Sequence, residues 1–262
     1  MLELAAYMTP AWAPTLALVI VRVAAMFLVA PVFSHAAVPI RLRVAMAMVV
    51  ALAVTARMAR PVAMPSNVLE ALLGVGAEAA IGAVIGYAAR LVFVGVQVGA
   101  LHIGQQMGVA LGGVFQPSGE GASGSGAAML HLLALLIFLA IGGHRELIGA
   151  LFQSFRSVPL KGFVPGEGTL EMVVGLLAVS FQVALKLAAP VLIALLLAGA
   201  AMGFLQKTLP QCHILSTNLP VRVLLGLLVL AAALAAMMAA VEWGWAATDA
   251  RITQFLKSGT PK

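Results

Sequence analysis

Residues 91–126 read LVFVGVQVGALHIGQQMGVALGGVFQPSGEGASGSG, and this stretch restricts the fold more than any other. It holds ten glycines, four glutamines, one histidine and a single charged residue, Glu120. A glycine in a helix costs about 1 kcal/mol relative to alanine, and buried amides need hydrogen-bond partners. Such a stretch suits close helix packing, or the wall of a polar pathway inside a membrane protein, better than it suits a simple lipid anchor.

The composition of the whole chain is that of a polytopic membrane protein. Its 262 residues are 63% hydrophobic and 9% charged, with a mean hydropathy of +1.09, whereas soluble domains carry about 25% charged residues. The net charge of +6 sits mainly at the ends of apolar segments, which suits interfacial flanks and argues against a nucleic-acid surface. The single cysteine, Cys212, excludes an internal disulfide framework.

The apolar stretches differ in length from a regular membrane span of about 20 residues. Three of them fit that length acceptably: 11–33, 127–143 and 223–241. Residues 44–56 are short for a span. Residues 68–115 and 172–205 would run about 70 Å and about 50 Å as single helices, against a hydrocarbon core of about 30 Å. We therefore expect each long stretch to bend, break or leave the bilayer.

Interruptions inside the two long stretches indicate where they would turn. Arg90 interrupts the first, and Lys186 and Pro190 interrupt the second. The sequence thus predicts an all-α integral membrane protein with about six short, kinked helical units and hairpins. These would form one polytopic membrane domain over residues 1–262, ending in a C-terminal tail at 242–262.

Charges within or beside the apolar segments are predicted to be buried. Arg22 lies midway along the first segment, where a cation costs about 2.5–3.5 kcal/mol unless it faces protein or water. Glu70 and Glu78 are two helical turns apart on one face, so either can pair with Arg22. An interhelical ion pair is favoured over a proton relay, because both carboxylates lie near the start of their segment. Lys186 is interpreted in the same way, with snorkelling as an added option.

Glycines recur at four-residue spacing, which lets helices approach closely. The groups are Gly104, Gly108 and Gly112; Gly82 and Gly86; and Gly95 and Gly99. Four polar side chains share the same region: Gln97, His102, Gln105 and Gln106. They would be costly against lipid, so they are expected to face a partner subunit or a wet lumen. His102 lacks a second ligand at metal-binding spacing, so it is interpreted as a hydrogen-bonded packing residue.

One motif resembles an enzyme site. Gly121-Ala122-Ser123-Gly124 precedes an apolar helix, as the GxSG nucleophile motif does in rhomboid intramembrane proteases. Such a protease needs a histidine on a later helix to deprotonate the serine. His131, His144 and His213 follow, and none is well placed. A loop rich in small residues is the favoured interpretation, and we predict no catalytic, cofactor-binding or metal-binding residue.

A series of motifs lies in fixed order along about residues 15–235. They are Arg22, Ala30-Pro31-Val32-Phe33, Pro39 with Arg41 and Arg43, Gln97, Gly99, Gln106-Met107-Gly108, Pro117, Gly143-His144, Ser154-Phe155, Pro159, Ala189-Pro190, Gly203, Lys207, Pro210-Gln211, Pro220 and Gly226. This series resembles the FliR/SctT family of the type III secretion export gate. The chain departs from the family pattern in its loops, where Gln116 replaces an aspartate, His213 an asparagine and Asn218-Leu219 a glycine-aromatic pair.

The resemblance implies a role in protein export. One copy would join several FliP-like and FliQ-like subunits in a helical export gate of the bacterial inner membrane, at the flagellar basal body and projecting toward the periplasm. FlhB-like and FlhA-like components would work beside it, and unfolded flagellar or effector proteins would pass through its lumen. No nucleic acid is implied.

The resemblance also implies roles for particular residues. The loop at 116–126 would be part of the plug that closes the resting channel. The plug residues would be Gln116, Pro117, Ser118, Gly119, Glu120, Gly121, Ser123 and Gly124. Residues that would pack against partners or face the lumen are Gly104, Gln105, Gln106, Gly108 and Gly112.

Two alternatives from other classes stay open at this point. A proton-coupled small-molecule permease would use Arg22, Glu70, Glu78 and Lys186, although no inverted repeat is visible in the sequence. A rhomboid-like protease would depend on Ser123.

Overall fold

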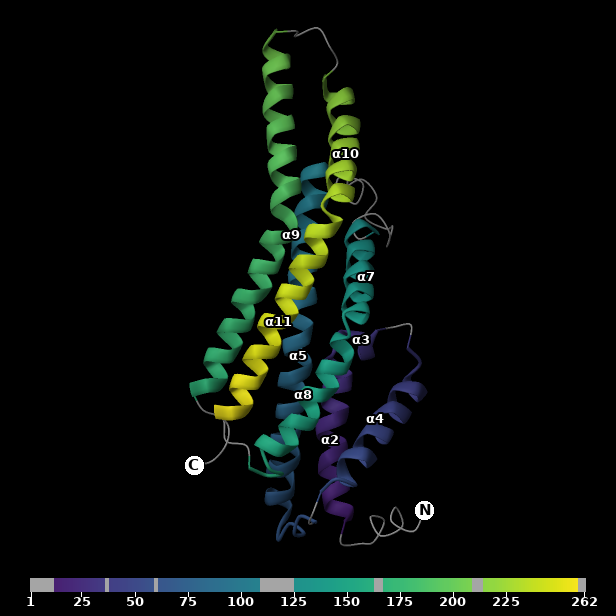
Figure 1. Cartoon of the computed structure of the whole chain (residues 1–262), viewed down its shortest axis with the longest axis vertical. Helices are drawn as coiled ribbons and strands as arrows, with labels where there is room; N and C mark the ends of the chain where they lie inside the picture. Colours follow the sequence, from purple (N-terminus) through teal and green to yellow (C-terminus); the bar gives the residue numbers. More distant parts are fainter. Residues whose placement is uncertain are drawn as a thin grey trace. The chain divides into compact units, whose positions relative to one another are not determined.

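A computed structural model of the chain describes residues 12–35, 38–58, 61–108, 125–162, 167–208 and 214–258. Within these ranges the structure is built of nine α-helices and no strand (Figure 1). They are α2 Ala13–Val29, α3 Pro31–Ser34, α4 Ile40–Thr55, α5 Val68–Met107, α7 Ser125–Ala140, α8 Gly143–Ser157, α9 Glu167–Thr208, α10 Ile214–Ala232 and α11 Leu234–Ser258. The all-α prediction is confirmed, whereas the predicted number of about six helical units is wrong.

Breaks inside the shorter apolar segments account for the extra helices. Ala30 is extended, with ψ 126°, because the following Pro31 disfavours a helical conformation for the residue before it. Gly142 has φ +80°, a left-handed conformation that glycine adopts readily, and α8 begins directly after it. At Ala233 the chain bends by 58° between the helical parts Pro220–Ala232 and Leu234–Lys257.

The first long apolar stretch is helical up to Met107, where α5 ends, and the second is helical throughout. α5 has 40 residues and α9 has 42, so each would be about 60 Å long if straight. The expectation that Arg90 interrupts the first is wrong, because its side chain is exposed and leaves the helix without a break. α9 continues through Lys186 and Pro190 but changes direction partway along (Figure 1), as expected for a helix with an internal proline.

Several helices of the described structure are suited to a membrane. Two are long and apolar enough to cross one, within α5 and α9, and there are up to four spans if each bent pair of helices counts as one. This supports the prediction of an integral membrane protein. Residues 242–258, predicted to be a tail, continue α11 as a helix.

The described residues fall into two compact units. Unit 1 draws on Met1–Leu91, Gly142–Leu176 and Ala247–Lys262, and unit 2 on Val92–Ile141 and Leu177–Ala246. The chain enters each unit more than once, and both α5 and α9 contribute to both units. Only contacts made inside the chain can define such a division, and they leave no marker in the hydropathy pattern. The single membrane domain expected from the sequence stays a prediction.

Unit 1 is built around α2. This helix packs against α3 and α4, and its buried face includes Val19 and Val23. On α5, Gly82 and Gly86 face α2: a Cβ added at Gly82 would overlap the carbonyl oxygen of Arg22, and one at Gly86 would lie 2.8 Å from the carbonyl oxygen of Met26. The glycines therefore let the two backbones touch, as the spacing predicted.

In unit 2, glycines allow the same close backbone approach between α5 and α9. A Cβ at Gly95 would overlap the carbonyl oxygen of Ser180, and one at Gly99 would lie 3.0 Å from that of Ala184. An aromatic cluster lies in the same unit, where Phe138 stands 5.4 Å from Phe93 and 4.9 Å from Trp245 between ring centroids. The edge-to-face geometry of both pairs is the favourable one for aromatic rings.

Candidate functional site: a buried ion pair and an open helix end

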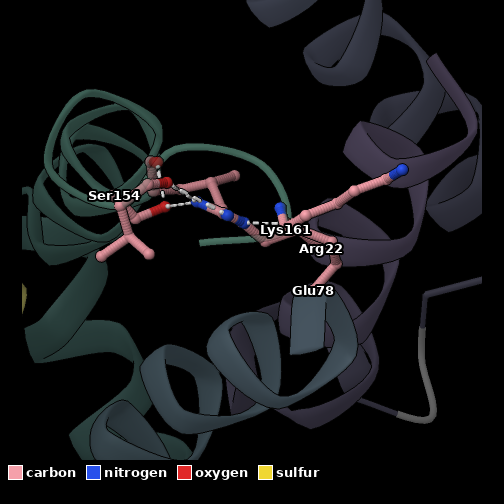
Figure 2. A network of polar contacts seen from close by, with 6 residues as sticks. Arg22, Glu78, Ser154 and Lys161 are labelled. Carbon is pink, nitrogen blue, oxygen red and sulfur yellow. Dashed lines mark hydrogen bonds and ion pairs between the residues drawn. The ribbon is translucent and has the colours of Figure 1, made fainter. Parts of the chain in front are cut away.

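Unit 1 contains an ion pair closed off from solvent. The Nε of Arg22 on α2 donates to Glu78 Oε2 on α5 at 2.5 Å, and both side chains are 0% exposed (Figure 2). A buried charge is tolerated only when it is paired and hydrogen-bonded, so each residue accounts for the burial of the other. The structure thereby brings together two of the charges that the sequence predicted to be buried.

The remaining donors of Arg22 meet the end of α8. Nη1 donates to Ser154 Oγ at 3.2 Å, and both Nη1 and Nη2 donate to the carbonyl oxygen of Val158 at 3.3 Å. The Ser154 hydroxyl donates in turn to Leu151 O at 2.7 Å, which leaves its lone pairs free to accept from Arg22. The ring of Phe155 lies 4.2 Å from the guanidinium carbon, a cation–π contact.

The second oxygen of Glu78 is held by a backbone amide. Lys161 N–H donates to Glu78 Oε1 at 3.0 Å, and Lys161 has φ 64°, a left-handed conformation that is unfavourable for a residue with a side chain. Its Nζ forms a second, partly exposed ion pair with Glu70 Oε1 at 3.0 Å. We call Arg22, Glu78, Ser154, Val158 and Lys161 the Arg22 clamp.

The Arg22 clamp fastens three helices and one turn. It joins α2, α5 and α8 to the turn that follows α8, as the dashed contacts of Figure 2 show. Arginine keeps its proton in proteins, and both carboxylate oxygens of Glu78 already accept N–H donors. The geometry supports the structural interpretation of this pair over a proton relay.

Sequence reasoning missed part of the Arg22 clamp. It assigned Lys161 no role, because the hydrogen bond from its backbone amide and its positive φ angle cannot be inferred from the residue type. Ser154-Phe155 and Pro159 stood among the family motifs, which marked this region without linking it to Arg22.

Glu70 and Lys186 were predicted to be buried, and the structure places both differently. The Glu70 side chain is 42% exposed and accepts from the backbone N–H and the hydroxyl of Ser66, each at 2.8 Å. Asn67 Oδ1 accepts from Glu70 N at 2.8 Å, so these residues cap the start of α5. Lys186 is exposed and extends its Nζ over the ring of Trp243, 3.2 Å from its centroid.

The C-terminal end of α5 is the second feature of interest. Gln97 hydrogen-bonds His131 Nδ1 at 3.2 Å, and His102 Nδ1 bonds Val98 O at 2.8 Å within the helix. Gln105 and Gln106 are exposed, and their side chains have no hydrogen-bond partner within the described part of the chain.

The glycine ridge at this end differs from the two packed pairs. A Cβ added at Gly104 would meet nothing within 4 Å, so no described element covers it. Gly108, with φ 78°, ends the helix, and Gly112 lies outside the described residues. We call Leu101, His102, Gly104, Gln105 and Gln106 the open end of α5. It is a surface rich in glycine and polar side chains at the end of a mostly apolar helix.

The predicted plug residues all lie outside the described residues. These are Gln116, Pro117, Ser118, Gly119, Glu120, Gly121, Ser123 and Gly124. The structure therefore gives no geometry for the loop or for the Ser123 motif. Among the residues it does describe, no group of three or more His, Cys, Asp or Glu side chains is arranged to hold a metal ion.

The long apolar helices define this chain as an all-α membrane protein, and comparison with known sequences gives its family. The family described as "Bacterial export proteins, family 1" matches residues 13–247, and the chain belongs to it. The resemblance to the FliR/SctT family is thereby confirmed.

Curated relatives agree with this assignment. The chain is 31% identical to the flagellar biosynthetic protein FliR of Caulobacter vibrioides over 228 residues, 87% of this chain and 90% of that protein. It is 27% identical to the protein of the same name from Bacillus subtilis over 221 residues, 83% and 85% of the two chains. It is also 24% identical to the Yop proteins translocation protein T of Yersinia pestis over 153 residues, 58% and 59% of the two chains.

Proposed function

We propose that this chain is a channel subunit of the type III protein export gate. With FliP-like and FliQ-like subunits it would form the inner-membrane pore through which unfolded flagellar proteins are secreted, beside FlhB-like and FlhA-like components. Membership of a bacterial export family supports this, as do relatives named for flagellar biosynthesis and for Yop translocation.

The open end of α5 is the observation that carries the proposal. The other glycine pairs of α5 are in contact with α2 or α9, whereas Gly104, beside the exposed Gln105 and Gln106, meets no other described part of the chain. Glycine and amide side chains are costly against lipid but suit close contact with another helix or a watery lumen. A partner subunit would supply that contact.

α9 points to the same need for partners. Only 22% of its most apolar 18-residue window is buried, against 61% for α5. Large side chains such as Leu196 and Leu197 are about two-thirds exposed, at 67% and 65%. Partner helices as well as lipid would cover this face.

The mechanism we propose is passive conduction with gating. The loop at 116–126, rich in glycine and serine, would obstruct the lumen at rest and move aside for an unfolded substrate. This subunit would make and break no bond. Energy would come from a separate ATPase and from the proton gradient acting through another component.

No contact among the described residues supports the permease or the rhomboid-like protease. A permease would need a carboxylate able to exchange protons, yet Glu78 is fixed by two N–H donors and Glu70 caps a helix. No observation favours the protease, since Ser123 lies outside the described residues.

A pair of matched substitutions on one helix tests the proposal. Gly104→Leu should abolish export of flagellar proteins, measured by swimming motility and by flagellin in the culture medium, because it fills the contact site of a partner. Gly76→Leu is the control, since Gly76 is also open to space on α5 but lies away from the open end. Normal export with Gly104→Leu, at normal protein levels, would overturn the proposed role of this surface.

A further inference from the structure

Unit 1 contains a cavity that neither the Arg22 clamp nor the proposed function uses. It lies between the end of α4 and the end of α8, with a volume of about 400 Å³. Arg57 and Arg156 line it, and no aspartate or glutamate of the described residues does. Its other walls are mainly apolar and include Val54, Met58, Phe152 and Leu160.

The two arginines are exposed and have no acidic partner among the described residues. Neither guanidinium makes a hydrogen bond or ion pair within the described part of the chain. Arg57 stands over the ring of Phe152, with its guanidinium carbon 5.8 Å from the ring centroid, which holds the charge beside the cavity. Two guanidinium groups facing one cavity suit an anion with several oxygen acceptors, above all a phosphate.

The far wall of the cavity is held in place before any ligand arrives. Phe155 and Pro159 line the cavity, and the same Phe155 ring covers the guanidinium of Arg22. The neighbouring Ser154 and Val158 belong to the Arg22 clamp. A ligand would therefore bind to a surface already fixed by a buried ion pair, so that binding would not carry the entropic cost of ordering that surface.

We propose that this cavity binds the phosphodiester of an anionic membrane lipid, with Arg57 and Arg156 on the phosphate and the apolar walls against the start of an acyl chain. A free phosphate would pair with the arginines but would make no apolar contact with Val54, Met58 and Leu160. A zwitterionic lipid would bring a choline cation toward two arginines. Charge complementarity and apolar walls together select an anionic lipid.

Photolabelling of the full-length chain tests the assignment. The chain, purified in mild detergent with any subunits that accompany it, is incubated with a phosphatidylglycerol that carries a diazirine on one acyl chain, and labelled peptides are mapped by mass spectrometry. Label should fall on residues 54–62 and 152–160. Unlabelled phosphatidylglycerol should compete for it, whereas phosphatidylcholine and inorganic phosphate at the same concentration should not.

Paired variants give the matched control. Arg57→Gln with Arg156→Gln should reduce labelling of the two segments about tenfold or more, as expected for the loss of two cations from an anionic-lipid site. Arg41→Gln, which removes an exposed arginine of α4 that lies outside the cavity, should leave labelling unchanged.

Several results would overturn the proposal. They are equal labelling in the double variant and the wild type, equal competition by phosphatidylcholine, or displacement by inorganic phosphate. The competition series uses the wild-type protein alone, so it decides the matter even if the double variant fails to assemble. The outcome does not depend on the export function.

Discussion

At the residue scale the molecule is organised by the Arg22 clamp. The sequence located its two charges, because an arginine midway along an apolar segment requires a buried partner, and Glu78 on a facing helix could supply one. It did not locate Lys161, whose contribution comes from a backbone amide in an unusual conformation. It also overestimated burial for Glu70 and Lys186, because hydropathy windows do not show that one caps a helix and the other extends over an indole ring.

Removing one partner of the buried pair should damage folding more than removing both. Glu78→Leu alone would leave a buried arginine unpaired, at a cost of about 3–5 kcal/mol, while adding Arg22→Met should recover much of that loss. Thermal unfolding of the detergent-purified protein measures both. Glu70→Gln, in the partly exposed pair, is the control and should lower the melting temperature far less. A double variant no more stable than the single would contradict the clamp.

The left-handed conformation of Lys161 makes a separate prediction. Lys161→Gly and Lys161→Val both remove the Nζ contact with Glu70 and keep the backbone N–H that Glu78 accepts. Glycine adopts φ 64° without strain, whereas valine does not, so the valine variant should be less stable by about 1–2 kcal/mol. Chemical unfolding of the two variants side by side measures the difference. Equal stabilities would argue against this backbone geometry.

At the scale of single elements, the glycine pattern was informative but incomplete. Four-residue spacing predicted close helix approach, and Gly82 and Gly95 show it against α2 and α9. The same spacing at Gly104 marks a surface that the described chain leaves open. Sequence alone cannot separate these cases, since an internal and an external partner demand the same small residue. The breaks before Pro31 and at Gly142, which raise the helix number, have local causes.

Alanine substitutions should separate the two kinds of glycine. Gly82→Ala places a Cβ against the Arg22 carbonyl oxygen and should destabilise the chain by about 1–3 kcal/mol through overpacking. The Cβ of Gly104→Ala meets nothing among the described residues, so this variant should stabilise α5 slightly, by up to about 1 kcal/mol, through helix propensity. Melting temperatures of the purified single chain report both effects. The assignment of the two surfaces would be wrong if the two variants lost equal stability.

At the scale of the whole molecule, composition predicted the class of protein, and the two compact units come from folded contacts. Hydropathy showed a helical membrane protein, and motif order led to the export family. It could not show two compact units, because each draws on distant parts of the chain that only folded contacts bring together. The long α5 and α9 exceed a bilayer of about 30 Å, which fits a subunit whose helices continue beyond the membrane.

The loop at 116–126 belongs to this scale, since its proposed role concerns the assembled channel. Deleting it should raise passive ion leak across the inner membrane, measured as loss of membrane potential in cells that express the complete gate. Ser123→Ala should leave both potential and export normal, because the loop acts by obstruction and not by chemistry. A tight membrane after deletion would refute the plug role, and lost export with Ser123→Ala at normal protein levels would point to a reactive serine.

We propose that this chain works as one subunit of a multi-subunit gate, and native mass spectrometry of the tagged protein would reveal the other subunits. The chain should be expressed with and without its neighbouring membrane genes and purified in mild detergent. When those genes are present, we expect one copy of the chain bound to several copies of small helical partners. A stable, partner-free monomer or homodimer in their presence would contradict it.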